Sequence, residues 1–130
     1  TVDITINVVK ESMFSIKRES ATRINPAEAD RYPMILKVKS IEDFEGRVVD
    51  YLPSSFNVVW QGEAIVNDTD DFKSVTWDVS LAAGEEIKLI YEYQAPEEGL
   101  NTYTIGRASI LSDGKKVFEE QNYWHIIVSF

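Results

Sequence analysis

The residues best suited to binding a metal lie in one acidic segment of the chain, Asn67-Asp68-Thr69-Asp70-Asp71. Calcium binds carboxylate and carbonyl oxygens, and Asp68, Asp70 and Asp71 could supply several of them from a loop. The segment does not fit the helix-loop-helix calcium motif, because Lys73 stands where glycine is required and no closing glutamate follows. Two interpretations stay open: a calcium loop, or a solvated loop tip between strands, which is the simpler of the two.

The aromatic residues suggest a second kind of chemistry, the stacking of sugar rings. The chain has three tryptophans and six tyrosines, enough for a platform of the kind found in carbohydrate-binding modules. Trp77 and Trp124 each alternate with aliphatic residues, which predicts that both lie in the core. Trp60 ends its predicted strand and is the candidate for glycan binding. The alternative is that Trp60 packs inward, as most aromatic residues of a β-sandwich do.

No set of residues indicates catalysis. The single histidine, His125, lies in a strand-like run, and a histidine base would need a nucleophile and an orienting acid beside it. With 22 acidic residues, no pair of carboxylates points to a glycosidase, although a hydrolase with dispersed carboxylates remains the weakest alternative. The six glycines lie too far apart for a phosphate-binding loop. We therefore expect no enzyme.

A lysine–asparagine crosslink is a further option, because some surface β-sandwiches form such isopeptide bonds spontaneously. Lys10 or Lys17 on early strands and Asn122 on the last one could be the partners. The reaction needs both side chains to face inward beside a protonated carboxyl group. Ordinary solvated lysines are the simpler interpretation.

The elements that would position these residues are β-strands. Apolar residues alternate with polar ones over residues 2–8, 14–16, 34–38, 56–60, 75–81 and 87–93. Such one-sided stripes are typical of antiparallel sheets with one buried face. The sequence therefore predicts an all-β, immunoglobulin-like antiparallel β-sandwich of about seven to nine strands. The residues expected in its core include Leu52, Trp77, Leu89, Tyr91 and Ile126.

Turns and breaks between the strands are marked by a few residues. Gly84 and the pair Asp113-Gly114 are predicted to form turns. A bulge near Gly106 and a break near residues 121–122 would explain the irregular alternation of the last third of the chain. Helix is expected as one short turn at most, near residues 26–31, where a capping Asn25 is followed by Pro26.

Composition limits the partners of the chain. With 13 basic and 22 acidic residues its net charge is −9, which argues against a nucleic acid partner. No apolar run approaches the roughly 18 residues of a membrane span, so this domain is not expected to insert into a membrane. The absence of cysteine excludes disulfides and thiolate metal sites. Residues 1–130 are predicted to form a single domain.

The middle of the chain resembles a known family. A strand ends in Asp50 and the pair Leu52-Pro53, and a strand carrying Trp77 precedes the turn Gly84-Glu85. Asp50 is expected to accept backbone N–H bonds in the turn that follows its strand. The order of these motifs, over residues 25–111, is similar to the conserved repeat domain of unknown function found, often in tandem, in bacterial and archaeal cell-surface proteins. The asparagine-glycine turn usual in that family is replaced by residues 40–43. The resemblance implies an immunoglobulin-like stalk, spacer or adhesive segment, with no catalytic residues and no cofactor.

These observations lead to one expected function and one alternative. We expect a non-catalytic structural, spacer or adhesion module of a larger exported or cell-surface protein, because strand-like pattern reaches both ends of residues 1–130 without a leader. Its expected partners are neighbouring domains of the same polypeptide, other surface proteins or glycans. The alternative is a carbohydrate- or calcium-binding β-sandwich module that uses Trp60 or the Asp68–Asp71 loop.

Overall fold

The computed structural model describes residues 13–97 and 99–129, and in these ranges its elements are twelve β-strands. The strands are β1 (Phe14–Glu19), β2 (Arg23–Ile24), β3 (Tyr32–Ser40), β4 (Phe44–Pro53), β5 (Asn57–Trp60), β6 (Ile65–Asp68), β7 (Phe72–Leu81), β8 (Glu86–Gln94), β9 (Asn101–Ile105), β10 (Ser109–Ser112), β11 (Lys115–Glu119) and β12 (Trp124–Val128). The predicted strand over residues 2–8 lies outside the described residues.

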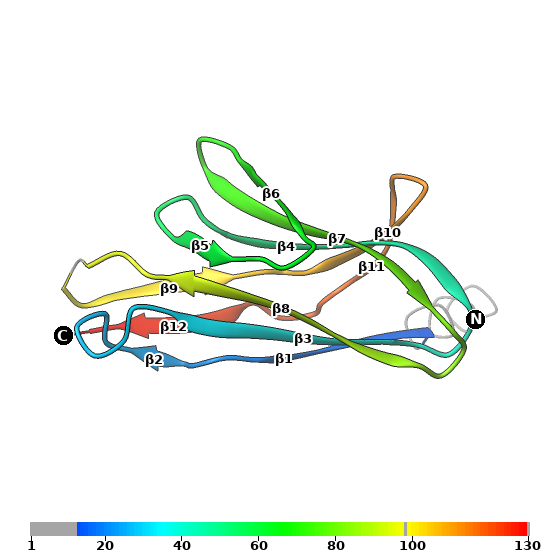
Figure 1. Cartoon of the computed structure of the whole chain (residues 1–130), viewed down its shortest axis with the longest axis horizontal. Coiled ribbons are helices and arrows are strands. Elements are labelled where there is room, and N and C mark those ends of the chain that lie inside the picture. Colours follow the sequence, from blue (N-terminus) through cyan, green and yellow to red (C-terminus); the bar gives the residue numbers. More distant parts are fainter. Residues whose placement is uncertain (1–12, 98, 130) are drawn as a thin grey trace, which may run out of the picture.

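The strands form two packed layers (Figure 1). The first sheet has the order β1-β3-β8-β5 and is antiparallel throughout. The second sheet has the order β11-β10-β4-β7-β6 and is also antiparallel. A smaller sheet, β2-β12-β9, continues the second one, because β9 leads into β10 and β11 into β12, and the Gly106 N–H donates to the Tyr51 carbonyl of β4 (2.8 Å).

The core lies between the layers and is filled by alternate residues of the long strands. In β3, for example, Met34, Leu36 and Val38 are fully buried, while the residues between them face outward. All five residues predicted for the core are buried: Leu52, Trp77, Leu89, Tyr91 and Ile126. The predicted all-β sandwich with antiparallel sheets is confirmed.

The twelve segments exceed the expected seven to nine because several runs are interrupted. The sequence predicts a bulge within one strand near Gly106, but the strand ends there instead, with β9 stopping at Ile105 and β10 starting at Ser109. The break predicted near residues 121–122 separates β11 from β12. The β10–β11 hairpin turns at Asp113 and Gly114, which have φ of 51° and 78°. Near residues 26–31 the chain forms one short turn, in which the N–H groups of Glu28 and Ala29 donate to the Asn25 carbonyl at 2.9 and 3.4 Å.

A buried ionic cluster joins the two layers. The guanidinium of Arg18 in β1 donates to both carboxylate oxygens of Asp50 in β4, at 2.8 and 2.7 Å. It also donates to Glu120, just after β11, at 2.5 and 3.3 Å. The Tyr91 hydroxyl of β8 donates to Asp50 at 2.7 Å. The side chains of Arg18 and Asp50 are only 3% and 0% exposed, so these bonds form within the sandwich.

Asp50 does not have the role expected for it in the repeat-domain motif. The sequence suggests that it accepts backbone N–H bonds in the turn that follows its strand, but its carboxylate instead points into the core and binds Arg18 and Tyr91. Burial alone would lower the pKa of Arg18, but the charges and hydrogen bonds of Asp50 and Glu120 outweigh it and raise that pKa. The guanidinium therefore stays charged, and the buried carboxylate has a partner.

Candidate functional site

The acidic segment predicted to bind calcium forms the tip of the β6–β7 hairpin. Thr69 closes the turn, because its N–H and its hydroxyl both donate to the Phe72 carbonyl, at 2.8 and 2.9 Å. Asp68, Asp70 and Asp71 are all exposed, and Asp68 lies 3.5 Å from the ammonium of Lys73. In the described part of the chain no group of three or more carboxylates or histidines is arranged to hold a metal ion. The calcium site stays a prediction.

The residues considered for catalysis and for crosslinking lie on the surface. His125 is exposed in β12, opposite Thr104 of β9. Lys17 is exposed on the outer face of β1, and Asn122 is exposed in the loop before β12, so neither has the inward orientation that an isopeptide bond needs. Lys10 lies outside the described residues.

Of the three tryptophans, Trp60 alone presents a largely accessible ring. Trp77 is buried between the layers, and Trp124 is partly buried, with its indole N–H donating to the Ala21 carbonyl (3.0 Å). The Trp60 side chain is 47% exposed at the end of β5, the edge strand of the first sheet. A bulge at Val59 places Trp60 opposite Glu92 of β8, on the outer face of that sheet.

The loop that follows β5 supports the Trp60 ring. Gly62 has φ of +59°, and a Cβ atom added to it would lie 3.3 Å from the Cη2 atom and 3.5 Å from the Cζ2 atom of Trp60. The chain therefore folds back so that the backbone of Gly62 lies against the indole, and only glycine combines this φ with this close approach. The ring is held in place by its own loop while much of its surface remains open to solvent.

Hydrogen-bonding groups surround Trp60 on the same face. Asn57 and Gln94 lie opposite each other across β5 and β8, and both are exposed. Next to them Glu92, opposite Trp60, accepts a hydrogen bond from Arg31 (3.1 Å), and this pair is also partly exposed. We call these five residues the Trp60 surface: Arg31, Asn57, Trp60, Glu92 and Gln94. It combines one apolar ring with planar amide and ionic groups that can both donate and accept hydrogen bonds.

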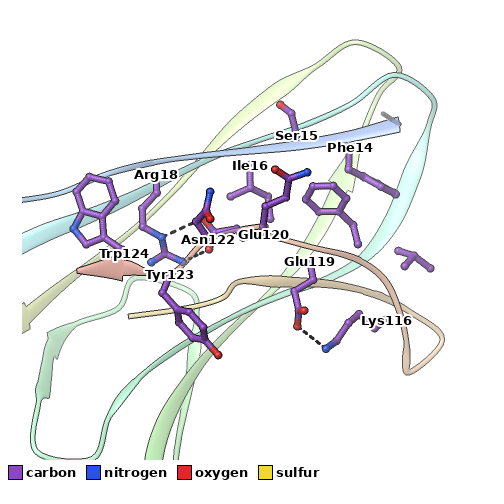
Figure 2. Close-up of a pocket in the computed structure, with 13 residues that line it drawn as sticks. Phe14, Ser15, Ile16, Arg18, Lys116, Glu119, Glu120, Asn122, Tyr123 and Trp124 are labelled. Atoms are coloured by element: carbon purple, nitrogen blue, oxygen red, sulfur yellow. Dashed lines mark hydrogen bonds and ion pairs between the residues drawn. The ribbon is translucent and has the colours of Figure 1, made fainter. Parts of the chain in front are cut away.

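A groove of about 760 Å³ opens on the opposite side of the sandwich, between β1 and the β11–β12 link (Figure 2). Its walls are partly apolar and include Phe14, Ile16 and Trp124. The charged groups that Figure 2 shows in it are already bonded to one another: Arg18 to Glu120, and Lys116 to Glu119 at 2.6 Å. The groove therefore offers a ligand few unpaired charges, and we regard the Trp60 surface as the better candidate site.

Sequence reasoning identified Trp60 but not its surroundings. The polar members of the Trp60 surface come from three strands or loops, and only the register of β5 on β8 brings them together. The buried cluster was also missed, although a signal for it exists: Arg18 shares the inward parity of Phe14 and Ile16. A charged residue on an apolar stripe indicates a buried ionic partner.

Comparisons with known proteins relate the fold to other β-sandwiches. No family model matches the chain, and no curated protein matches it in sequence; the resemblance to the surface repeat domain stays a prediction. Among solved structures, the chitin-binding domain of a hyperthermophilic chitinase from Pyrococcus furiosus superposes with a TM-score of 0.52 at 10% identity, over 82% of this chain and 93% of that one.

A second similar structure is the β-glucosidase from Listeria innocua in complex with glucose, with a TM-score of 0.51 and 14% identity. That match covers 90% of this chain but only 16% of the glucosidase. At these identities the likeness shows the fold alone, a β-sandwich. In the described residues no helix has the length and apolar character needed to cross a membrane.

Proposed function

We propose that this chain is a non-catalytic carbohydrate-binding module of a larger exported or cell-surface protein, and that the Trp60 surface binds the glycan. The observation that carries the proposal is the half-exposed indole of Trp60, held against Gly62 and bordered by exposed amide and ionic groups. The similarity of the fold to a chitin-binding domain supports it.

The chemistry of the Trp60 surface suits a sugar ring. The C–H face of a pyranose is apolar and flat, so it can cover the indole and remove apolar area from water. Its hydroxyl groups, which leave the ring at the edges, would meet the amides of Asn57 and Gln94 and the carboxylate of Glu92. Because the indole is already supported by Gly62, little conformational entropy would be lost on binding.

A substitution of Trp60 tests the proposal. In Trp60→Ala the stacking area is removed, and we expect affinity for the bound glycan to fall by about tenfold or more, since a central aromatic residue commonly contributes about 2 kcal/mol. Binding would be measured by pull-down on insoluble chitin and cellulose and by calorimetry with soluble oligosaccharides. The matched control is Tyr123→Ala, which removes another half-exposed aromatic ring at the groove. Equal binding by Trp60→Ala and the unmodified chain would refute the assignment of the site.

A spacer or adhesion role, with neighbouring domains of the polypeptide as partners, is the second candidate. The buried cluster favours it, because Arg18 ties β1, near the start of the described residues, to β4 and to the link before β12. Such a connection would resist separation of β1 from the second sheet under load. The same binding measurements separate the two roles, since a pure spacer would retain no oligosaccharide.

A further inference from the structure

Three lysines lie side by side across the outer face of the first sheet. Lys17 of β1 is directly opposite Lys37 of β3, which is directly opposite Lys88 of β8. Residues opposite each other in antiparallel strands share one face, and neighbouring strands are about 4.8 Å apart. The strands β1, β3 and β8 are neighbours in the first sheet (Figure 1). The three lysines therefore form a continuous row across them, which we call the lysine row.

The lysine row is unfavourable for the sheet by itself. Like charges directly opposite each other destabilise a strand pair. Among the described residues, Lys37 forms an ion pair with the Glu19 carboxylate at 2.7 Å, and the same carboxylate also attracts Lys88. Lys17 and Lys88 are exposed. Two register positions further along β3, Lys39 adds a fourth ammonium group opposite Glu86.

This concentration of cations contrasts with the rest of the chain. The molecule carries 22 acidic and only 13 basic residues, yet four of those basic residues lie within two register positions of one sheet face. Two carboxylates, Glu19 and Glu86, share this part of the face, so four ammonium groups against two carboxylates leave it locally positive on an acidic protein. Charge complementarity favours an anionic partner at this place, and repulsion from the remaining surface would keep such a partner on this face.

The lysine row shares its face with the Trp60 surface. On β8, Lys88 is four residues from Glu92, the residue opposite Trp60, which is about 13 Å along the strand. Between them, Ile90 and Ile35 lie opposite each other and are half-buried. An oligosaccharide of a few sugars that stacks on Trp60 could thus extend over these isoleucines to the lysines.

We propose that the lysine row is a second part of the glycan site and that the natural ligand is an anionic polysaccharide, whose carboxylate or sulfate groups meet Lys17, Lys37 and Lys88. This inference rests on the proposed function. It names the class of glycan, which the Trp60 surface alone does not.

The experiment removes the two exposed charges of the row and leaves the ion pair of Lys37 intact. The variant Lys17→Gln/Lys88→Gln is compared with Arg23→Gln/Lys115→Gln, which changes the net charge equally at exposed positions on β2 and β11. Affinities for oligogalacturonate, dextran sulfate, chitohexaose and single-stranded oligo(dT) are measured by calorimetry at low and at high salt. Circular dichroism and melting curves establish that both variants are folded.

We expect Lys17→Gln/Lys88→Gln to bind oligogalacturonate or dextran sulfate about five- to tenfold more weakly at low salt, and Arg23→Gln/Lys115→Gln to bind within about twofold of the unmodified chain. The difference should shrink as salt screens the charges. Whichever of the two probes shows it identifies the anionic group as carboxylate or sulfate.

Four outcomes would overturn the inference. Equal weakening by both double variants would show that only net charge matters. Binding of chitohexaose through Trp60 without binding of either anionic glycan would refute the role of the lysine row in glycan binding and leave the proposed function intact. Equally tight, lysine-dependent binding of oligo(dT) would make the row a general polyanion site and not a glycan site. If no oligosaccharide binds the unmodified chain at all, the proposed function itself falls, and this inference with it.

Discussion

At the scale of single residues, the site depends on how one side chain is held. Trp60 has an accessible ring because the bulge at Val59 turns it to the outer face of the sheet. The loop after β5 then turns back at Gly62, which lies against the indole with φ of +59°. Trp60 could be selected from the sequence because it ends its predicted strand. Trp77, in contrast, lies within a stripe of alternating apolar residues, which predicts burial. The support that Gly62 gives to the ring could not be predicted from the sequence. A glycine two residues after a tryptophan does not by itself indicate that the loop folds back onto the indole.

Replacing Gly62 with alanine should weaken glycan binding while the domain remains folded. The new Cβ would meet the Trp60 ring at 3.3 Å and the backbone would be held in the left-handed region, so the indole should shift. Gly84→Ala is the control, because Gly84 has a similar φ of +79° but open space around its Cβ position. Both variants should lose about 1 kcal/mol of stability. Only Gly62→Ala should change the tryptophan fluorescence and the affinity; equal affinities of the two variants would contradict this role of Gly62.

Tyr91 gives a pH dependence that can be measured. Burial, and then the charge of Asp50, raise the pKa of Tyr91 well above its usual value. The folded chain therefore keeps this proton at a pH where a tyrosine of the unfolded chain has lost it. The resulting stabilisation is complete below about pH 10 and is lost as the pH rises further.

Tyr91→Phe is therefore expected to have two effects in denaturant unfolding. At pH 7 the variant should be less stable by about 1–3 kcal/mol, because Asp50 loses a hydrogen-bond donor. Above pH 10 its stability should fall less steeply than that of the unmodified chain, although Tyr93, whose pKa is also raised by burial, still contributes to both. Parallel pH profiles would show that Tyr91 is not the group that titrates.

At the scale of elements, the buried cluster makes β1 part of both layers. β1 pairs with β3 in the first sheet, while Arg18 crosses the core to Asp50 of the second. Without its cation, Asp50 would remain buried as an uncompensated charge, and Glu120 would lose its main partner. Such a loss is far more costly than that of an exposed pair.

Arg18→Met should therefore lower the free energy of unfolding by about 3–5 kcal/mol in urea titration. Arg47→Met is the matched control, since Arg47 pairs with Asp78 at 3.0 Å on the surface, with both side chains more than half exposed. That variant should lose no more than about 1 kcal/mol. A loss of similar size in the two variants would mean that the buried cluster stabilises the fold no more than an exposed ion pair does.

The strands were largely predictable from the sequence, whereas the pairing and register between them were not. Alternation identifies β3, β7 and β8 because one buried face imposes a period of two on the sequence. Pairing and register depend on contacts between distant segments, so the row formed by Lys17, Lys37 and Lys88 appears only when β1, β3 and β8 are aligned. Asp50 shows the same limit: its position before Leu52 suggests a turn, but its partner Arg18 lies 32 residues away.

At the scale of the whole molecule, the groove and the outer face of the first sheet differ in the groups that they expose to a ligand. The groove between β1 and the β11–β12 link contains charges that are paired with one another. The outer face of the first sheet instead carries an exposed indole at one end and a row of ammonium groups toward the other. On a chain with net charge −9, that face is the one suited to an extended ligand.

The most direct test of glycan binding through Trp60 is a two-dimensional NMR titration that follows the three tryptophan indole N–H signals. Chitohexaose, cellohexaose and oligogalacturonate would be added in turn to the isotopically labelled chain. Trp77, which is buried, and Trp124, whose N–H is bonded to Ala21, serve as internal controls. We predict that at least one glycan shifts the Trp60 signal strongly and leaves the other two nearly unchanged. Shifts confined to Trp124, beside the groove, or no shift at all, would contradict the account.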